Sequence, residues 1–326
     1  LPGLPPQPFI GPVVPESVGA TQLGTAGALG TASTASTAIT AGTATWYRPA
    51  LLTGDSTHQH LAGGLKIGAR FHSAPVVRIG DDIPVHQIMR FNELAASRAA
   101  HAAGVSPAVL YHEPGALVID FVTGRTMTAA DLREADLLEQ ALALVMHAHR
   151  DIPRHLRGPA LTFWVFQTLR DYAGTLQDGR SRHLGLVSGL LDQAADLERA
   201  VGRIEMVFGH NDLLPANFLH DGTRMWLIDW DYAGWGSPLF DLGGLAANNG
   251  LDRAQEDWLL SAYYGAAPDA DLWHRYRAMK AAAALREAMW SMVQEIHSDL
   301  DFDYAAYTAD YLDTYRAALA AFRTGK

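Results

Sequence analysis

The sequence predicts an α+β protein with two lobes, a small lobe rich in β-strands followed by a large, mainly helical lobe. Three observations predict this order. Short apolar and β-branched runs, separated by turn residues, lie before residue 124. After that point, long segments carry apolar residues at helical spacing. One pair of short apolar runs between polar loops, within residues 205–241, interrupts these helices.

The N-terminal segment, residues 1–60, differs in composition from the rest of the chain. Residues 1–15 are rich in proline, and residues 24–45 consist almost entirely of Gly, Ala, Thr and Ser without a charged side chain. Such a composition buries little apolar surface to offset the entropy that is lost on ordering. We therefore expect residues 1–60 to form a low-complexity extension, to which the sequence assigns no role.

The small lobe is expected over residues 61–124. Three short runs predict strands: Val76–Ile79, Ala108–Tyr111 and Ala116–Phe121. The last two flank a Glu-Pro-Gly turn, which favours a hairpin. Between the first and second of these runs, Val85–Ala103 has apolar residues at helical spacing and is followed by Gly104, a frequent helix terminator. This order of elements predicts a compact mixed lobe.

The large lobe is expected over residues 125–326. Amphipathic spacing predicts three helices before the polar loops: Ala129–His149, Leu161–Leu176 and Leu184–Val201. Two apolar runs, Met206–Phe208 and Met225–Ile228, predict a short β-hairpin. Helical spacing resumes at Gln255 and continues to the end of the chain.

Charge and composition exclude several classes of protein. The chain has 25 Lys and Arg against 35 Asp and Glu, a net charge of −10, which argues against a binder of nucleic acid or of anionic membranes. It has no cysteine, so a disulfide scaffold, a thiol nucleophile and a cysteine-based metal site are excluded. No apolar run approaches the roughly 18 residues of a membrane span. We expect a cytoplasmic protein.

The loops of the predicted hairpin carry the strongest functional signal. The first reads GHNDLLPAN over residues 209–217, and the second reads LIDWDY over residues 227–232. Phosphoryl transfer needs one carboxylate that faces the acceptor hydroxyl, and one carboxylate and one amide oxygen that hold Mg²⁺ on the phosphates. The two loops offer these groups from adjacent strand ends, and oxygen ligands suit Mg²⁺.

We assign roles within these loops on that basis. Asp212 is predicted to be the catalytic base, Asn217 and Asp229 to be Mg²⁺ ligands, and His210 to orient the loop. The alternative is that each aspartate only caps a turn by accepting hydrogen bonds from backbone amides. For Asp231 two interpretations stay open, a place in the substrate site or a turn cap.

The sequences of these loops resemble those of a known superfamily. The pattern His-x-Asp-x-x-x-x-Asn followed by Ile-Asp-Trp-Asp is similar to that of the aminoglycoside phosphotransferases and choline kinases, relatives of the protein kinases. The fuller strings HNDLLPANFL (His210–Leu219) and LIDWDYAG with SPLFDLGGLAANNG (within Leu227–Gly250) resemble the choline/ethanolamine kinase branch. The resemblance implies a protein-kinase-like fold that binds ATP and Mg²⁺ between its lobes. It also implies that Asp241 fixes the catalytic loop.

The same resemblance implies nucleotide contacts in the small lobe. Arg78 corresponds to the basic residue that touches the phosphates, and Glu93 to the helix glutamate that pairs with it. The alternative is an ordinary surface ion pair of little energetic value. Gly63 and Gly64 would lie in the loop that covers the phosphates. Lys66 and Ile67 follow where family members usually carry a small polar residue.

The resemblance further implies transfer of the γ-phosphate to the hydroxyl of choline or a related amino alcohol, a small and cationic substrate. Tyr232, Trp290 and Tyr307 are candidates for an aromatic box around an ammonium group. Glu287 stands where the family often has a second tryptophan, and its carboxylate would attract a cation. The alternative is that the tyrosines at helical spacing near the C-terminus belong to the core.

Two other functions compete with this one. A phosphotransferase could act on another amino-bearing hydroxyl compound, such as an aminoglycoside-type antibiotic or thiamine. A non-catalytic kinase-like binding protein is the alternative of another class, although Asp212, Asn217 and Asp229 are all present.

Overall fold

A computed structural model of the chain describes residues 75–298, 300 and 302–325, and the backbone of four short strands within residues 37–67. Gly63 and Gly64 lie outside the described residues, as does most of the N-terminal extension. Strands β1 (Thr37–Ala41) and β2 (Ala44–Arg48) fall within residues 1–60. They pair with each other, and β2 pairs with β5 (Pro75–Ile79). The sheet of the small lobe therefore includes residues of the segment expected to be an extension.

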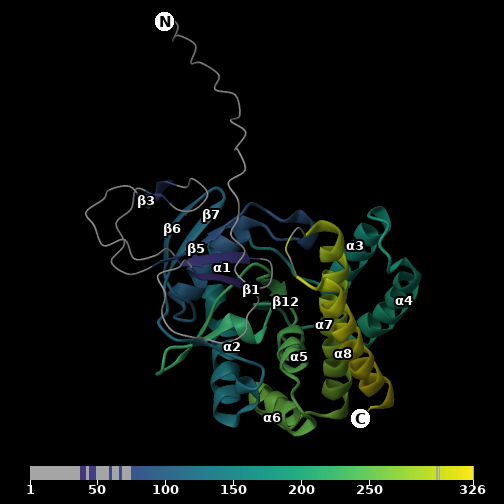
Figure 1. The fold of residues 1–326 in the computed structure, drawn as a ribbon. Helices are drawn as coiled ribbons and strands as arrows, with labels where there is room; N and C mark the ends of the chain where they lie inside the picture. Colours follow the sequence, from purple (N-terminus) through teal and green to yellow (C-terminus); the bar gives the residue numbers. More distant parts are fainter. Residues whose placement is uncertain are drawn as a thin grey trace, which may run out of the picture. The chain divides into compact units, whose positions relative to one another are not determined.

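The small lobe is built on a five-stranded antiparallel sheet of order β1-β2-β5-β7-β6 (Figure 1). Its other two strands are β6 (Val109–Glu113) and β7 (Ala116–Asp120), and a further short pair is β3 (Gln59–His60) with β4 (Lys66–Ile67). Val76 of β5 and Leu117 of β7 are buried, and Leu94 of helix α1 (Arg90–Ala102) packs against this apolar cluster. The sheet thus fixes α1 beside its central strand.

The predicted helix over Val85–Ala103 begins later than expected, at Arg90. Pro84–His86 forms one turn of 3-10 helix, and Gln87 has a left-handed backbone with φ of 60°. A left-handed residue ends a helical turn, and apolar periodicity carries no information about it.

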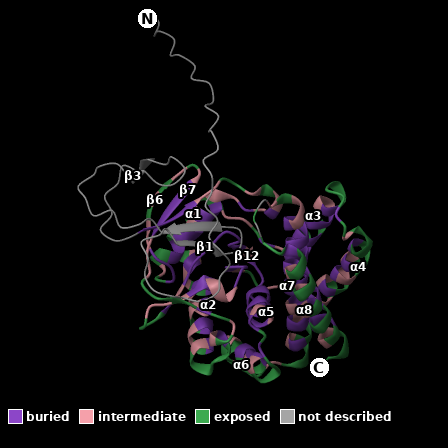
Figure 2. Cartoon of the chain, in the orientation of Figure 1, coloured by how far each residue is buried: buried purple, intermediate pink, exposed green. Residues whose placement is uncertain are grey.

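The large lobe is mainly helical. Its helices are α2 (Ala135–His155), α3 (Val165–Asp178), α4 (Leu184–Val201), α5 (Pro238–Asn249), α6 (Arg253–Tyr264), α7 (Ala270–His297) and α8 (Tyr304–Thr324). Helix α7 is its centre and packs against α3, α4, α5 and α8 (Figure 1). Figure 2 shows buried residues concentrated along α5 and α7. None of the helices that the structure describes is long and apolar enough for a bilayer crossing.

Helix α5 was missed by the expectation that helices resume only at Gln255. Its start carries a standard signal, since the Ser237 hydroxyl accepts a hydrogen bond from the amide of Leu239 and Pro238 occupies the first turn. Ten of its residues are buried, so it lacks the polar face on which an amphipathic pattern depends.

The strands inserted among the helices form two small sheets. Strand β9 (Val207–Gly209) pairs with β12 (Gly234–Gly236). Strand β10 (Phe218–His220) lies between β11 (Met225–Leu227) and β8 (Arg125–Thr126). These pairings hold the two polar loops, residues 210–217 and 228–233, beside each other.

Close packing of α5 on α7 depends on Gly243. A Cβ atom at this position would lie 2.8 Å from the Cα of Lys280 and 2.9 Å from its backbone nitrogen. We expect Gly243→Ala to lower the free energy of unfolding by about 1–3 kcal/mol, because helix backbones cannot yield as a side chain can. Gly244→Ala is the matched control, since a Cβ there meets nothing within 4 Å. Equal denaturation midpoints for the two variants would contradict this account.

Candidate active site

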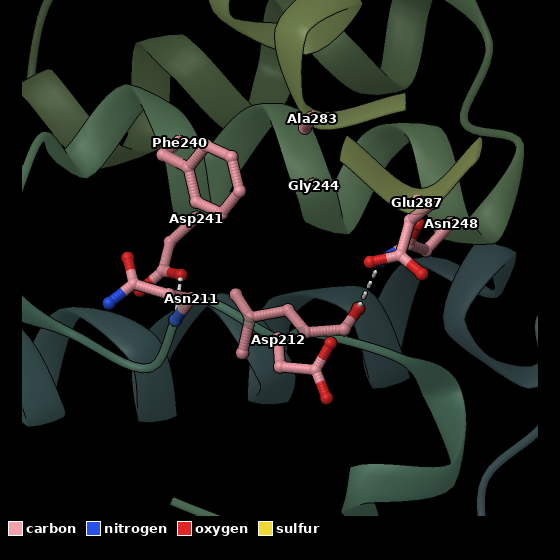
Figure 3. Close-up of a pocket in the computed structure, with 9 residues that line it drawn as sticks. Asn211, Asp212, Phe240, Asp241, Gly244, Asn248, Ala283 and Glu287 are labelled. Carbon is pink, nitrogen blue, oxygen red and sulfur yellow. Dashed lines mark hydrogen bonds between the residues drawn. The ribbon is translucent and has the colours of Figure 1, made fainter. Parts of the chain in front are cut away.

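One carboxylate holds the start of the loop over residues 210–217. The backbone amide of His210 donates to Asp241 Oδ2 at 2.8 Å, and the amide of Asn211 donates to Oδ1 at 2.7 Å. Figure 3 shows Asp241 of α5 beside Asn211 at one end of a cavity. Asn211 is left-handed, with φ of 63°, which turns the chain sharply towards Asp212. Asp241 therefore acts on the loop through its backbone.

Asp241 is itself held ionised. His149 Nε2 donates to its Oδ2 at 2.8 Å, and His149 Nδ1 lies 2.8 Å from the Tyr263 hydroxyl. Burial alone would raise the pKa of Asp241, but the hydrogen bond and charge of His149 outweigh it and leave the pKa below its usual value. The loop is thus anchored to α2 and α5 through a charged buried group.

His210 ties this loop to the next. Its Nε2 donates to the carbonyl oxygen of Ile228 at 2.9 Å, and its ring packs on Trp230 with 4.7 Å between ring centroids. Burial lowers the pKa of His210, so the ring is neutral near pH 7. A neutral ring that bonds the residue before Asp229 suits the predicted orienting role.

Asp212 and Asn217 face each other across the loop. Asn217 Nδ2 donates to the backbone oxygen of Asp212 at 2.8 Å and lies 3.3 Å from Asp212 Oδ2. With its amide nitrogen used in this way, Asn217 presents a buried Oδ1 that has no hydrogen-bond partner among the described residues. Burial raises the pKa of Asp212, and Arg286 opposes that rise.

Asp229 follows β11 in a left-handed conformation, with φ of 68°. Its Oδ1 is buried and has no hydrogen-bond partner in the described part of the chain. Burial raises its pKa well above the usual value, and the charges of Asp231, Asp212 and Glu93 raise it further against the opposing charge of Arg90. The site concentrates negative charge that a cation would neutralise.

These residues fit Mg²⁺. Asn217 Oδ1 and Asp229 Oδ1 are unpaired oxygen acceptors, the ligand type that this hard cation prefers. No cluster of three or more His, Asp or Glu able to hold a metal occurs within the described ranges. Mg²⁺ in phosphoryl-transfer sites needs no such cluster, because one or two protein ligands act together with substrate phosphates.

Arg78 and Glu93 form the predicted pair. Arg78 Nε donates to Glu93 Oε1 at 2.9 Å and Nη2 donates to Oε2 at 2.5 Å, with both side chains buried. This bidentate geometry differs from the surface ion pair of the alternative. Burial raises the pKa of Glu93 to about 7, against the opposing charges of Arg78 and Arg90.

Arg90 is a site residue that sequence reasoning missed. Its Nη1 lies 3.0 Å from Glu93 Oε2 and 2.7 Å from Asp231 Oδ1. Asp231 is therefore more than a turn cap, since its carboxylate bridges to α1, and its place in the substrate site stays a prediction. Through Arg90, the pair in the small lobe is linked to the loop that carries Asp229.

The residues predicted to bind the acceptor substrate also lie in one cluster beside Asp212. The Tyr307 hydroxyl donates to Glu287 Oε2 at 3.2 Å, and the rings of Tyr307 and Trp290 are 5.9 Å apart at 64°. Tyr232 joins this cluster through a residue that the sequence reasoning did not name. Arg286 bonds Glu287 and lies with its guanidinium carbon 4.0 Å from the Tyr232 ring centroid.

Most of the chain, including the two loops of this site, matches a known protein family. The model of the phosphotransferase enzyme family matches residues 75–287. The chain belongs to this family. Its relatives include mouse ethanolamine kinase 2, which is 26% identical over 253 residues, or 69% of this chain and 65% of that kinase. The chain thus spans less than two thirds of the length of this relative. LicA of Haemophilus influenzae is 24% identical over 254 residues, or 72% of this chain and 91% of LicA.

Solved structures give the same fold. A choline/ethanolamine kinase family protein from Mesorhizobium loti has a TM-score of 0.66 at 24% identity, covering 89% of this chain and 92% of that one. A structure of LicA in complex with AMP has a TM-score of 0.60 at 17% identity, covering 82% and 91%. The predicted family and the two-lobed kinase-like α+β fold are confirmed. The roles of individual residues stay predictions.

Among the described residues, two cavities border this site. One of about 10 Å³, room for about one water molecule, is lined by Asp212, Asn248 and Glu287 among others (Figure 3). The other, of about 340 Å³, is lined by Asp231 and Tyr232 together with residues around Gln87 and Phe163.

Proposed function

We propose that this phosphotransferase transfers the γ-phosphate of ATP to the hydroxyl of a small amino alcohol, with Mg²⁺ as cofactor. One observation carries the proposal. Two buried oxygen atoms without partners among the described residues, Asn217 Oδ1 and Asp229 Oδ1, flank the loop of the buried Asp212. Ligands for a metal and a carboxylate for a hydroxyl are the parts that this reaction requires.

Each residue has a definite part in the proposed reaction. The acceptor oxygen bonds to the γ-phosphorus, the bond from that phosphorus to the bridging oxygen breaks, and ADP leaves. Asp212 orients the hydroxyl and takes its proton, for which a pKa raised by burial is suited. Asn217 and Asp229 would hold Mg²⁺, which supplies charge neutralisation on the phosphates. Arg78, fixed by Glu93, would contact the phosphates.

The acceptor class rests on two supports. One relative is named ethanolamine kinase 2, and one solved neighbour belongs to a choline/ethanolamine kinase family. In the site, the Glu287 carboxylate lies beside the aromatic rings of Tyr307 and Trp290, where an ammonium group would find both charge and ring faces.

A panel of acceptors tests the proposal. The protein is incubated with ATP, Mg²⁺ and choline, ethanolamine, thiamine or an aminoglycoside, and phosphorylated product is followed by ³¹P NMR. Transfer to an amino alcohol is expected. Transfer to thiamine or an aminoglycoside alone would contradict the acceptor class, and nucleotide binding without transfer to any acceptor would favour a kinase-like binding protein.

A further inference from the structure

Arg286 is the least satisfied charged residue near the site. Its side chain is 2% exposed, yet its Nε and Nη2 have no hydrogen-bond partner in the part of the chain that the structure describes. Only Nη1 is used, towards Glu287 and, at 3.3 Å, towards Asp212 Oδ1. A buried donor without an acceptor is costly, and a charged one more so. The two donors are therefore available to acceptor atoms that the described residues do not supply.

The position of Arg286 bears directly on the acceptor. Its guanidinium lies over the ring of Tyr232, with 4.0 Å from its carbon to the ring centroid. Tyr232 was a candidate for the aromatic box around choline, and an internal cation already covers one face of its ring. A quaternary ammonium gains little from a ring so occupied and offers no lone pair to Nε or Nη2.

Neighbouring groups add to the surplus of donors. Trp290 Nε1 is also buried without a partner among the described residues. In the same cluster Glu287 supplies negative charge, and Tyr307 and Arg286 each bond one of its oxygens. The cluster thus offers a cation with free donors next to a carboxylate, an arrangement complementary to a zwitterion.

We propose that the acceptor is an amino alcohol that also carries a carboxylate, a hydroxyl-bearing amino acid, and that Arg286 binds that carboxylate through Nε and Nη2. The ammonium group lies towards Glu287 and the hydroxyl towards Asp212. This inference rests on the proposed function and specifies its acceptor. Arg286 is a specificity residue in it, because it contacts the substrate away from the reacting atoms.

The first test compares acceptors that differ only in the carboxylate. L-Serine is matched with ethanolamine, and L-homoserine with 3-aminopropanol, at saturating ATP and Mg²⁺. We expect kcat/KM to favour the amino acid of at least one pair by about tenfold to a hundredfold, because the amine alone leaves both Arg286 donors unpaired. Choline is expected to be the poorest acceptor.

The second test changes Arg286 in the full chain. Arg286→Gln is expected to reduce the amino acid to amine ratio of kcat/KM by about tenfold or more. Arg286→Lys, which keeps the charge but loses the bidentate geometry, should fall between Arg286→Gln and the wild type. Arg316→Gln is the matched control, since Arg316 is 63% exposed on α8 and pairs only with Asp313 at the surface. Thermal unfolding of each variant establishes that it is folded.

The outcomes separate this inference from the proposed function. Phosphorylation of choline or ethanolamine, without preference for either amino acid, overturns the inference and leaves the function standing. Preference for an amino acid that persists in Arg286→Gln overturns the role of Arg286. If no amino alcohol with or without a carboxylate is phosphorylated, the proposed function itself fails. The wild-type comparison decides the acceptor even where a variant does not fold.

Discussion

Asp212→Asn is expected to lower kcat by about 10²- to 10⁴-fold, the usual contribution of a positioned general base. The substitution keeps the shape of the side chain, and the bond from Asn217 Nδ2 to the backbone oxygen at 2.8 Å does not involve the carboxylate. The loop should therefore stay in place while the group that takes the hydroxyl proton is lost. Steady-state turnover and the affinity for a fluorescent ADP analogue are to be measured together, and the affinity should change by only a few-fold.

A matched control for this variant lies on the surface. Asp313 is 77% exposed on α8, so Asp313→Asn makes the same chemical change far from the loop. Turnover should remain at the wild-type value. If Asp212→Asn retained wild-type turnover, Asp212 would be a structural cap and the assignment of the base would fall.

The loop over residues 210–217 was predictable because its candidate functional residues lie close together in the sequence. Asp212 and Asn217 lie in one loop, and Asp229 follows β11, the second strand after that loop, so one hairpin brings the three residues together. Strand pairing between β10 and β11 then fixes the distance between the two loops. Residues that are near in sequence need no knowledge of tertiary packing.

Arg90 and Arg286 could not be found in this way. Arg90 reaches Asp231 across 141 positions of sequence, and nothing local distinguishes it from a surface arginine three residues before a glutamate. Arg286 reaches Asp212 across 74 positions. Here a signal existed, because the pair Arg286-Glu287 interrupts an otherwise apolar run of α7, and charged side chains are seldom buried unless they are paired.

Asp229→Asn is expected to separate function from stability. Asparagine tolerates the left-handed backbone at this position, so the change removes charge without strain. Losing a metal ligand should lower turnover by about 10²- to 10³-fold. It should also abolish the rise in melting temperature that Mg²⁺ with ADP gives the wild type by mass action.

In the metal-free protein, Asp229→Asn should increase stability instead of reducing function. Burial and the charges of Asp231, Asp212 and Glu93 raise the pKa of Asp229, so its carboxylate costs stability as pH rises above the ordinary aspartate value. Asp229→Asn removes that cost and should raise the free energy of unfolding by about 1–3 kcal/mol, with a larger gain at pH 8 than at pH 5.

The buried Asp241 is the control for this stability test, because its pKa is shifted in the opposite direction from that of Asp229. Its pKa is lowered because His149 and the loop amides outweigh the effect of burial, so its ionised form stabilises the fold above the ordinary aspartate pKa. Asp241→Asn should therefore lower the melting temperature at both pH 5 and pH 8. Shifts of the same sign for the two variants would mean that Asp229 is satisfied by the protein alone. Burial and like charges raise the pKa of Asp229 despite the opposing charge of Arg90, as expected of a ligand that binds a cation. The two variants compare its effect on stability with that of a carboxylate that the protein itself stabilises.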